Sequence, residues 1–496
     1  MSEESDVLGE PTSPRRSNVE SGMLSKKGMS TLRVVSCGCD FGSYCHCSWS
    51  SPGMSFGFPA VALPQLNLNI DEASTFASLG AIAMPIGCLL SGPVIDRYGR
   101  RTALMLINLP SFMGWLLIAS KPHLTRLYVA RLLTGLAVGL ATTPAAVYSA
   151  ECLTVHKMSL RGSLTTWSTV ALTSGILLVY FTGALLAYTT VAIIASAISL
   201  LSLVLISLFI PESPTWLIDQ GRFDDAENAD KILKIHRKRT ASECSQLIPK
   251  DSPKEKKEEF FSMETIRKTV QDFREPEAYK PLVIMITFLF FQQFSGLYVM
   301  ITYMVDIISS AGVEVVNPYL VTVISGVVIL IAAISVTFLL PIFGVRKLSM
   351  FSCLGVSVSM LTYGMYLSVR SKVPWVSNYP IFGLIPVFAI VLNVWMSGIG
   401  FIPIPYSMLG EVFPPHVKGT AGGIASSLSS IFCFIAIKTY PYLFLNLEAG
   451  IFYLYGTLAL FASLFVIYYL PETRGRTLEE INSSFSSKKK SEYEQH

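Results

Sequence analysis

Charged residues are scarce in this sequence, and their scarcity is uneven. Asp, Glu, Lys and Arg make up 15% of the 496 residues, whereas soluble domains carry roughly 25%. Apolar residues make up 51%, and the mean hydropathy is +0.51. The charges gather in short blocks between uncharged runs, each close to the ~20 residues that a helix needs to cross a bilayer. The composition therefore argues against a soluble protein and predicts a polytopic membrane protein.

The sequence also lacks the marks of a secreted protein. Its first thirty residues are polar and have no apolar core, so they do not resemble a cleavable signal peptide. The cysteines number nine, an odd count, and most lie in apolar runs, where we expect free thiols. The single Asn-X-Ser/Thr sequon, at Asn482, falls in a predicted cytoplasmic tail. We therefore expect the first span itself to direct insertion, with the N-terminus in the cytoplasm.

Lys and Arg concentrate in alternate connections between the apolar runs. By the positive-inside rule these connections are cytoplasmic. Two pairs, Lys121/Arg126 and Arg370/Lys372, are exceptions that fall on the predicted outer side. With both termini basic and inside, the number of spans is even, and the apolar runs predict twelve. They lie near residues 33–60, 73–95, 103–120, 126–149, 161–182, 187–210, 280–304, 318–340, 348–369, 379–403, 419–443 and 450–470.

These spans predict an all-α membrane protein in two six-helix halves. A cytoplasmic tail (1–32) precedes the N-terminal half (33–210), a charged cytoplasmic loop with short amphipathic helices (211–279) separates it from the C-terminal half (280–470), and a tail (471–496) ends the chain. The halves look like copies, since Pro211-Glu212 and Pro471-Glu472 follow their last spans. Parallel halves of this kind place a substrate site between them near the membrane midplane, which implies solute transport.

The segment Cys37–Cys47 holds four cysteines with His46 and Asp40, a density that suggests a zinc site. It lies in the first predicted span, however. As a helix its ends would stand about 15 Å apart, whereas zinc ligands must all lie ~2.0–2.3 Å from one ion. We therefore predict no metal here, and cysteines that fill helix contacts.

The connection after the second predicted span, Gly92–Arg101, contains an ordered set of glycine, acidic and basic residues. Topogenic charge alone would account for its arginines, but not for the order Gly92, Asp96, Gly99. We therefore expect a gating role at the cytoplasmic surface. The corresponding connection after span eight, Pro341–Lys347, has lost the acidic residue.

Six motifs occur in an order that resembles the signature of the sugar porter family of the major facilitator superfamily, and three further pieces look like its insect facilitated trehalose transporter branch. The six are Gly92–Arg101, Arg131–Gly135, Tyr148–Glu151 with Arg161-Gly162, Pro211–Leu217, Gln292–Gly296 and Pro471–Leu478; the three are Asp71–Ser74, Pro85–Pro93 and Pro403–Glu411.

The resemblance implies the major facilitator fold with twelve transmembrane helices, alternating access by rocking of the halves, and a central site for a sugar. Such a neutral ligand requires amides, hydroxyls and aromatic faces. Where the family has its sugar contacts, this chain carries two matching glutamines and four departures from the pattern: Gln292, Gln293, Tyr298, Tyr406, Thr169 and Ser430, the last from a Ser429-Ser430 pair. The alternative for the two amides is that they bridge neighbouring helices.

By the same resemblance, charged residues at the cytoplasmic face form the gate when it is closed. These are Asp96, Arg97, Arg100, Arg101, Glu151, Arg161, Glu212, Glu411, Lys418, Glu472 and Arg474. The alternative for each is a solvated surface charge, and exposed pairs are worth only ~0–1 kcal/mol.

Proton-coupled members of the family carry an acidic residue in span one, where alignment places Gly57. We therefore expect facilitative uniport of trehalose or a hexose across the plasma membrane; Asp40 is the residue that could overturn this. A sugar receptor, a proton-coupled carrier and a polyol transporter remain alternatives. No convergent nucleophile, metal or acid-base pair indicates an enzyme. We expect no cofactor, no nucleic acid and no partner protein, only the sugar and the lipid bilayer.

Overall fold

The computed structural model describes residues 49–120, 123–144, 147–148, 161–232, 273–312, 316–373, 380–414, 417–474, 480 and 485. In these residues eleven helices are long and apolar enough to cross a membrane. Residues 49–62 form a further helix, which is the described part of the first predicted span. The all-α, multi-pass prediction is thus confirmed. The whole cysteine segment, Cys37–Cys47, with Asp40 and His46, lies outside the described residues.

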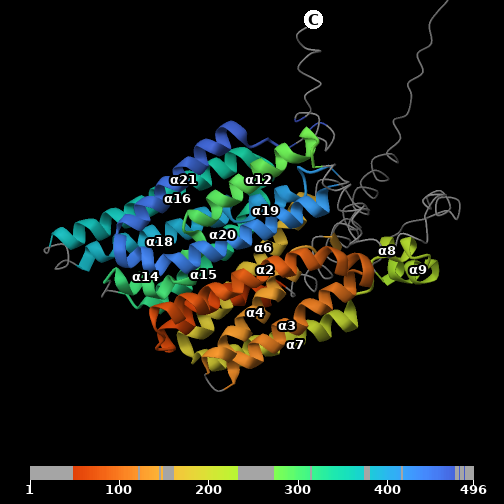
Figure 1. Cartoon of the computed structure of the whole chain (residues 1–496), viewed down its shortest axis with the longest axis horizontal. Helices are drawn as coiled ribbons and strands as arrows, with labels where there is room; N and C mark the ends of the chain where they lie inside the picture. The colour runs from red at the N-terminus through yellow and green to blue at the C-terminus, as the bar shows by residue number, and fades with distance from the viewer. Residues whose placement is uncertain are drawn as a thin grey trace, which may run out of the picture.

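Two helical bundles lie side by side, as Figure 1 shows. In the N-terminal half, α2 packs on α4, and α3 packs on both α4 and α7; in the C-terminal half, α16 packs on α18 and α21, and α12 on α20. The halves meet where α2 contacts α20 and where α6 contacts α15. The N-terminal helices are η1 (Leu63–Gln65), α2 (Ile70–Tyr98), α3 (Arg100–Ala119), α4 (Leu124–Ala141), α6 (Arg161–Leu185) and α7 (Tyr188–Phe209).

The C-terminal half contains two spans that are not continuous helices. The seventh is divided at Gly296, which has a φ of +81°, and again at Tyr303; the tenth contains a π-helical turn, η4. The sequence predicted both as unbroken runs. The helices of this half are α12 (Pro276–Phe294), α13 (Leu297–Thr302), α14 (Met304–Ser310), α15 (Pro318–Phe343), α16 (Val345–Lys372), η3 (Pro380–Gly383), α18 (Leu384–Met396), η4 (Ser397–Phe401), α19 (Pro403–Leu409), α20 (Lys418–Leu447) and α21 (Gly450–Tyr469).

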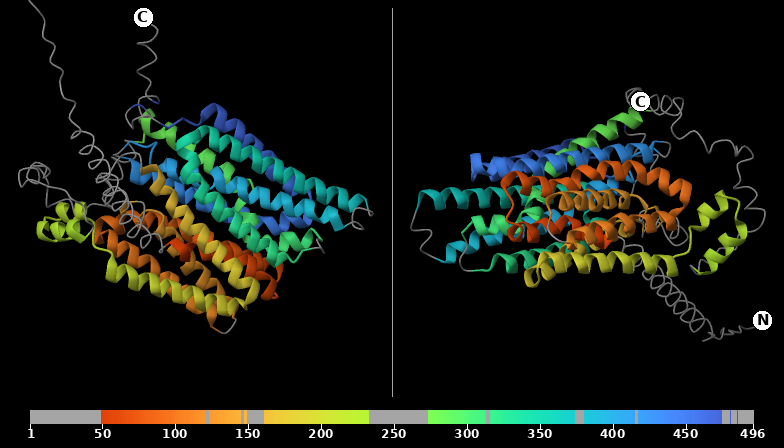
Figure 2. Two further views of the ribbon diagram at one scale, coloured as in Figure 1. Left: turned by 180° about the vertical axis from the view of Figure 1, so that it is seen from behind. Right: turned by 60° about the horizontal axis from the view of Figure 1, so that its bottom comes forward.

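Two short helices, α8 (Pro214–Asp219) and α9 (Phe223–Ile232), stand beyond one end of the bundle (Figures 1 and 2). They belong to the charged middle loop, so we call this the inner end and the opposite one the outer end. The Trp216 indole donates to the Asp96 carbonyl at 3.1 Å, which ties α8 to the end of α2. Leu217, Ala226 and Ala229 form a small core between α8 and α9. The amphipathic helices predicted for this loop are therefore present here.

The Gly92–Arg101 segment was predicted as a connection, and this was wrong. Helix α2 continues through Tyr98, and α3 begins at Arg100. Only Gly99 separates them; its φ of +89° favours glycine. Gly344, with a φ of +79°, separates α15 from α16 in the same way in the other half. Gly92, Asp96 and Arg97 therefore occupy defined faces of a helix.

Arg370 is one of the basic residues that fall on the predicted outer side, against the positive-inside rule, and its position has a structural reason. Its guanidinium donates to the Ala311 carbonyl at the end of α14. A cation at the C-terminus of a helix satisfies an otherwise free carbonyl and interacts favourably with the helix dipole. Arg370 therefore has a local structural role at the outer end that the topology rule does not consider.

Candidate functional site

Two adjacent amides, Gln292 and Gln293, lie in the last turn of α12, just before the seventh span breaks, and both are buried. The Gln293 Nε2 atom donates to the Ser429 hydroxyl at 2.8 Å, and this hydroxyl lies 3.1 Å from the Tyr406 hydroxyl. The Gln292 Nε2 atom donates to the Phe401 carbonyl oxygen at 2.5 Å. Both glutamines therefore join α12 to neighbouring helices, as the packing alternative predicted, but this accounts for only one end of each amide.

The other end of each amide is unsatisfied. Gln292 Oε1 and Gln293 Oε1 are buried and have no hydrogen-bond partner among the described residues. Leaving a buried acceptor unpaired costs about 1–3 kcal/mol. A ligand with several hydroxyl groups could satisfy such oxygens, so the arrangement fits a binding site as well as a packing contact.

Aromatic side chains border these amides. The Tyr298 ring of α13 lies 5.3 Å, centroid to centroid, from the Phe56 ring of the first helix, so this contact joins the two halves. Tyr406, in α19, is 36% exposed although it sits in a membrane span, and its hydroxyl contacts Ser429. An exposed tyrosine beside buried amides provides a face on which a sugar ring can stack.

The two remaining predicted contacts lie on either side of this cluster. Thr169 is half-buried on α6, which packs against α19, and its carbonyl accepts a bond from the Thr173 hydroxyl. Ser430 is buried on α20; its hydroxyl donates to the Ser426 carbonyl and contacts the Cys88 thiol of α2. The structure therefore makes Ser429, rather than Ser430, the residue that connects an amide to the tyrosine.

At the outer end the halves are joined by polar contacts. Lys438 of α20 donates to the hydroxyls of Ser74 and Thr75 of α2, at 2.9 and 2.7 Å. One turn further out, the Tyr442 hydroxyl donates to the Asp71 carboxylate. Tyr180 of α6 donates to the Ile301 carbonyl of α13 at 2.7 Å. These bonds close the outer side of the site.

Toward the inner end, there is free space beside the same two helices. The Cys88 thiol and the Pro85 carbonyl of α2 still contact Ser430 and Ser427 of α20. One turn further in, on the same faces, lie Gly92 and Gly423. A methyl group added at either would meet no atom within 4 Å among the described residues, and the same is true at Gly419 and Gly422. Within the described part of the chain, the site is therefore open toward the inner end.

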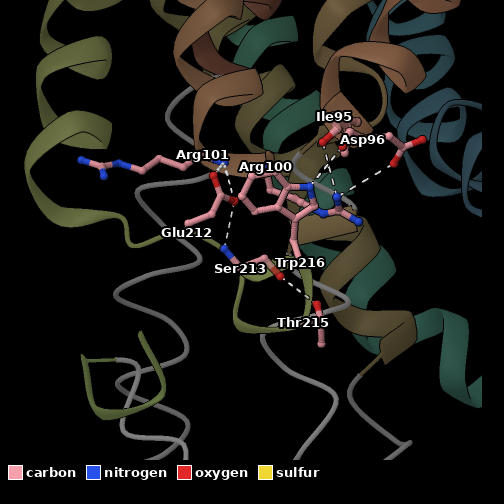
Figure 3. Close-up of polar contacts among 8 residues, drawn as sticks. All are labelled: Ile95, Asp96, Arg100, Arg101, Glu212, Ser213, Thr215 and Trp216. Carbon is pink, nitrogen blue, oxygen red and sulfur yellow. Dashed lines mark hydrogen bonds and ion pairs between the residues drawn. The ribbon is translucent and has the colours of Figure 1, made fainter. Parts of the chain in front are cut away.

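Four predicted gating residues of the N-terminal half gather at the start of α3 (Figure 3). The Glu212 carboxylate accepts bonds from the backbone N–H groups of Arg100 and Arg101, at 2.7 and 3.1 Å. Asp96 lies 3.9 Å from the Arg100 guanidinium, and the Arg101 guanidinium donates to the Ser207 carbonyl. Glu212 therefore caps α3 and lies against the positive end of its dipole.

The C-terminal half repeats this arrangement. The Glu472 carboxylate accepts bonds from the N–H groups of Val345 and Arg346, at 3.0 and 3.2 Å, and so caps α16. The Arg474 guanidinium donates to the Ile342 carbonyl at 2.5 Å. The capped helices begin after Gly99 and Gly344, which have nearly the same φ and ψ. The repeat predicted from the two Pro-Glu motifs is therefore present as matching caps.

The remaining predicted gating residues vary in exposure. Arg97 is exposed and lies over the Tyr98 ring at 5.7 Å. Glu411 is half-buried; burial raises the pKa of its carboxyl, while a hydrogen bond from Thr473 and the charge of Lys418 lower it. Lys418 begins α20. Glu151 and the side chain of Arg161 lie outside the described residues.

Two cations with structural contacts were given no role from the sequence. Lys438 interrupts an apolar run, which could have identified it, because ionised groups inside spans are rare and functional. Arg131 is buried in α4 and donates to Ser55, through its carbonyl and hydroxyl, and to the carbonyls of Phe76 and Ala77. All of these partners are neutral.

The chain matches known proteins over most of its length. A family model described as "Sugar (and other) transporter" matches residues 65–485. The facilitated trehalose transporter Tret1 of Apis mellifera ligustica is 33% identical over 420 residues, 84% of this chain and 80% of that protein. Tret1 of Aedes aegypti is 31% identical over 396 residues, 80% of this chain; the chain spans about half, 47%, of that longer protein.

A solved structure gives the fold. The major facilitator proton:xylose symporter XylE, bound to 6-bromo-6-deoxy-D-glucose, is similar with a TM-score of 0.68 at 21% identity, over 90% of this chain and 100% of that one. The predicted fold and family resemblance are confirmed. Since the family model spans so much of the sequence, the chain belongs to the sugar porter family of the major facilitator superfamily, whose members are transporters and not enzymes.

Proposed function

We propose that the chain carries trehalose or a hexose across the plasma membrane by facilitative uniport, with both termini in the cytoplasm. The observation that supports this most is that the amide oxygens of Gln292 and Gln293 are buried in a sugar porter without a partner among the described residues. They are uncharged acceptors beside a hydroxyl chain and an exposed tyrosine. A neutral polyhydroxyl ligand matches this set better than an ionised one would.

The sugar is proposed from relatives and from the site together. The curated relatives at 33% and 31% identity are named facilitated trehalose transporters. The positions where this chain departs from the family pattern carry Tyr298, Tyr406, Thr169 and Ser430. All four carry a hydroxyl, which can both donate to and accept from a sugar.

Alternating access is proposed from the two ends of the interface between α2 and α20. Polar contacts hold the outer end closed through Lys438 and Tyr442, whereas Gly92 and Gly423 face open space at the inner end. We expect rocking of the halves to reverse this, and the predicted gating charges to approach one another when the inner end closes. The energetic cost is modest, because exposed ion pairs are worth only ~0–1 kcal/mol each.

Uniport is proposed because the buried cation near the site has neutral partners. Arg131 donates to Ser55 and to backbone carbonyls, so the groups it contacts cannot release a proton. Gly57, where alignment places the acidic residue of proton-coupled members, is closely packed. A side chain there would begin 3.2 Å from the Tyr180 ring and 3.4 Å from Ile176.

One acidic group favours the proton-coupled alternative. Asp306 lies in the first turn of α14 at the outer end, and desolvation raises the pKa of its carboxyl to about 6. It would titrate over the range of external pH in which a coupled carrier responds. Its place outside the central site supports a modulating role rather than a coupling role.

The test is uptake of labelled trehalose and labelled glucose into oocytes that express the chain, on either side of the Asp306 pKa of about 6. We expect uptake of at least one sugar with little dependence on external pH. Uptake that requires acidic pH in both the wild type and D306N would contradict uniport and implicate Asp40. If neither sugar enters while the protein is at the surface, a receptor or a polyol transporter becomes the better interpretation.

A further inference from the structure

The tenth span is weakened in its middle by two separate features. In η4 the hydrogen bonds lengthen to a π pattern, with the Ile402 N–H donating to the Ser397 carbonyl at 2.9 Å. Immediately afterwards come Pro403 and Pro405. Proline has no N–H, so the carbonyls one turn earlier, those of Ile399 and Phe401, lose their helical donors. Such π turns and prolines are the usual causes of a bend in a helix.

Side chains from two other helices bind the backbone at this point. The Phe401 N–H donates to the Ser352 hydroxyl of α16 at 2.9 Å. The Phe401 carbonyl, which Pro405 leaves without a donor, accepts from Gln292 Nε2 of α12. Both backbone polar groups of Phe401 are therefore contacted by side chains of other helices.

Ser352 is inserted into the hydrogen-bond ladder of the tenth span. Its hydroxyl accepts from the Phe401 N–H and donates to the Met396 carbonyl at 2.6 Å. Met396 and Phe401 are five residues apart, the spacing of a direct π-helical bond. The serine hydroxyl therefore bridges the two backbone groups that define the π turn, and so braces it from α16.

The position is available only because α16 and the π turn approach closely. A Cβ atom added at Gly400 would lie 2.8 Å from the Ser352 Cβ and 3.0 Å from the Leu348 carbonyl oxygen. Such distances are shorter than normal contacts, so any larger residue at Gly400 would push the helices apart. Ser352 itself is fully buried. The contact is therefore a specific one, and water does not compete with it.

The same bonds fix the orientation of the Gln292 amide. Its Nε2 atom faces two carbonyl oxygens, those of Phe401 and Ile402, at 2.5 and 3.3 Å. The reversed orientation would bring three oxygens together, so the amide cannot flip. Its Oε1 atom is therefore directed elsewhere, and it is the buried acceptor without a partner.

We propose that Ser352 is a positioning residue for sugar binding: by bracing the π turn of the tenth span it places the Phe401 carbonyl, which in turn aims the unpaired oxygen of Gln292 at a sugar hydroxyl. This proposal rests on the proposed transport function. It assigns Ser352 a part in affinity although its own hydroxyl is already engaged by two backbone groups of another helix.

The first test compares S352A with a matched control, S357A. Ser357 is also a buried hydroxyl of α16 and also donates to a backbone carbonyl of another helix, that of Gly456 at 2.7 Å. We expect S352A to raise the half-saturating trehalose or glucose concentration about fivefold, as for one lost hydrogen bond, with little change in the maximal rate. S357A should leave the half-saturating concentration unchanged. Equal effects of the two variants would overturn the proposal.

The second test is a double-mutant cycle on the purified protein, read as the unfolding midpoint in detergent. If Ser352 and Gln292 act through Phe401, S352A should shift the midpoint much less in the Q292A background than in the wild type. Additive shifts would overturn the proposal. Because this measurement needs no transport, it decides the role of Ser352 even if the wild type takes up neither sugar, an outcome that would reject the proposed function alone.

Discussion

The outer and inner ends of the α2–α20 interface differ in chemistry although they belong to the same pair of helices. At the outer end, long polar side chains such as Lys438 and Tyr442 reach across to Ser74 and Asp71. At the inner end the facing residues are Gly92 and Gly423, with open space beside them. Side-chain bonds can hold two helices at one spacing, whereas glycines let helices pack closely or stand apart without a clash.

Under the proposed alternating access, this difference would let one interface serve two states. Contacts at the outer end stabilise the conformation described here. When they break, the polar groups that become exposed can be solvated by water. At the inner end, the two helices can approach each other only if no side chain stands between them. The comparison therefore predicts that larger side chains at the inner end, and loss of polar contacts at the outer end, reduce transport.

The largest effect is expected from bulk at the inner end. G92W and G423W should each reduce sugar uptake by at least about tenfold, because an indole in the closing interface cannot be packed without strain. Folding should be preserved, since a Cβ atom at either position meets no described atom within 4 Å. Uptake and surface expression are measured together.

The matched control is L90W. Leu90 is 43% exposed on α2 and, two residues from Gly92, faces a different side of the helix. Normal uptake by G92W, or equal loss in L90W, would show that the inner end of α2 does not need to close.

The next effect is expected at the outer end. K438M removes the charged hydrogen bonds to Ser74 and Thr75, and bonds of this kind contribute about 1.5–3 kcal/mol. The balance should shift toward the outward-facing state by about tenfold or more, with a change in uptake of a few fold. The measurement is labelling, by an impermeant thiol reagent applied outside, of a cysteine introduced as S427C.

T439V is the control for this change. The Thr439 hydroxyl bonds only to the Ile435 and Ala436 carbonyls of its own helix among the described residues. If K438M and T439V label at the same rate, the lysine does not hold the outer end closed.

A smaller effect tests whether the two halves are equivalent. E212Q removes the negative charge that caps α3, and E472Q removes the one that caps α16. We expect each change to lower the stability by about 1 kcal/mol. Because the caps have the same geometry, the shifts in the unfolding midpoint should be similar. A large shift for one and none for the other would mean that the repeat is not energetically equivalent.

The smallest effect concerns pH. Burial raises the pKa of the Glu411 carboxyl above its ordinary 4.5, so the folded protein binds this proton more tightly than the unfolded chain does. Stability contributed by this group is present below pH 4.5 and declines as pH rises through the folded pKa. E411Q should therefore be slightly more stable than the wild type at neutral pH, and this advantage should vanish on acidification. A less stable E411Q at neutral pH would mean that the charge of Lys418 outweighs the desolvation.

The fold could be predicted from the sequence because a bilayer imposes a simple rule on the backbone. Long apolar runs must become helices, since every backbone group needs a partner inside the chain. The same rule hides interruptions within a run: Gly296 and the π turn before Pro403 break spans seven and ten, yet apolar composition continues through both. Their freed backbone groups are satisfied by side chains such as Ser352 and Gln292.

The candidate site was predictable in part for a related reason. Gln292 and Gln293 were conspicuous as paired amides in an apolar run, and both lie in the polar cluster. Ser429 was not singled out because serine is common in these helices, and its role depends on which way its hydroxyl points. Lys438 could have been identified, because a cation inside a span is visible in the sequence. Its partners on α2 could not be predicted from the sequence.

The most direct test of the central claim, that the two ends open reciprocally, is a pair of spin-label distances measured on the purified carrier. One pair, G92C with G423C, spans the inner end, and another, N67C with N446C, spans the outer end, in a transport-competent background without native cysteines. On addition of the transported sugar the account predicts a population with a shorter inner and a longer outer distance. Distances that stay unchanged, or that change in the same direction at both ends, would contradict it.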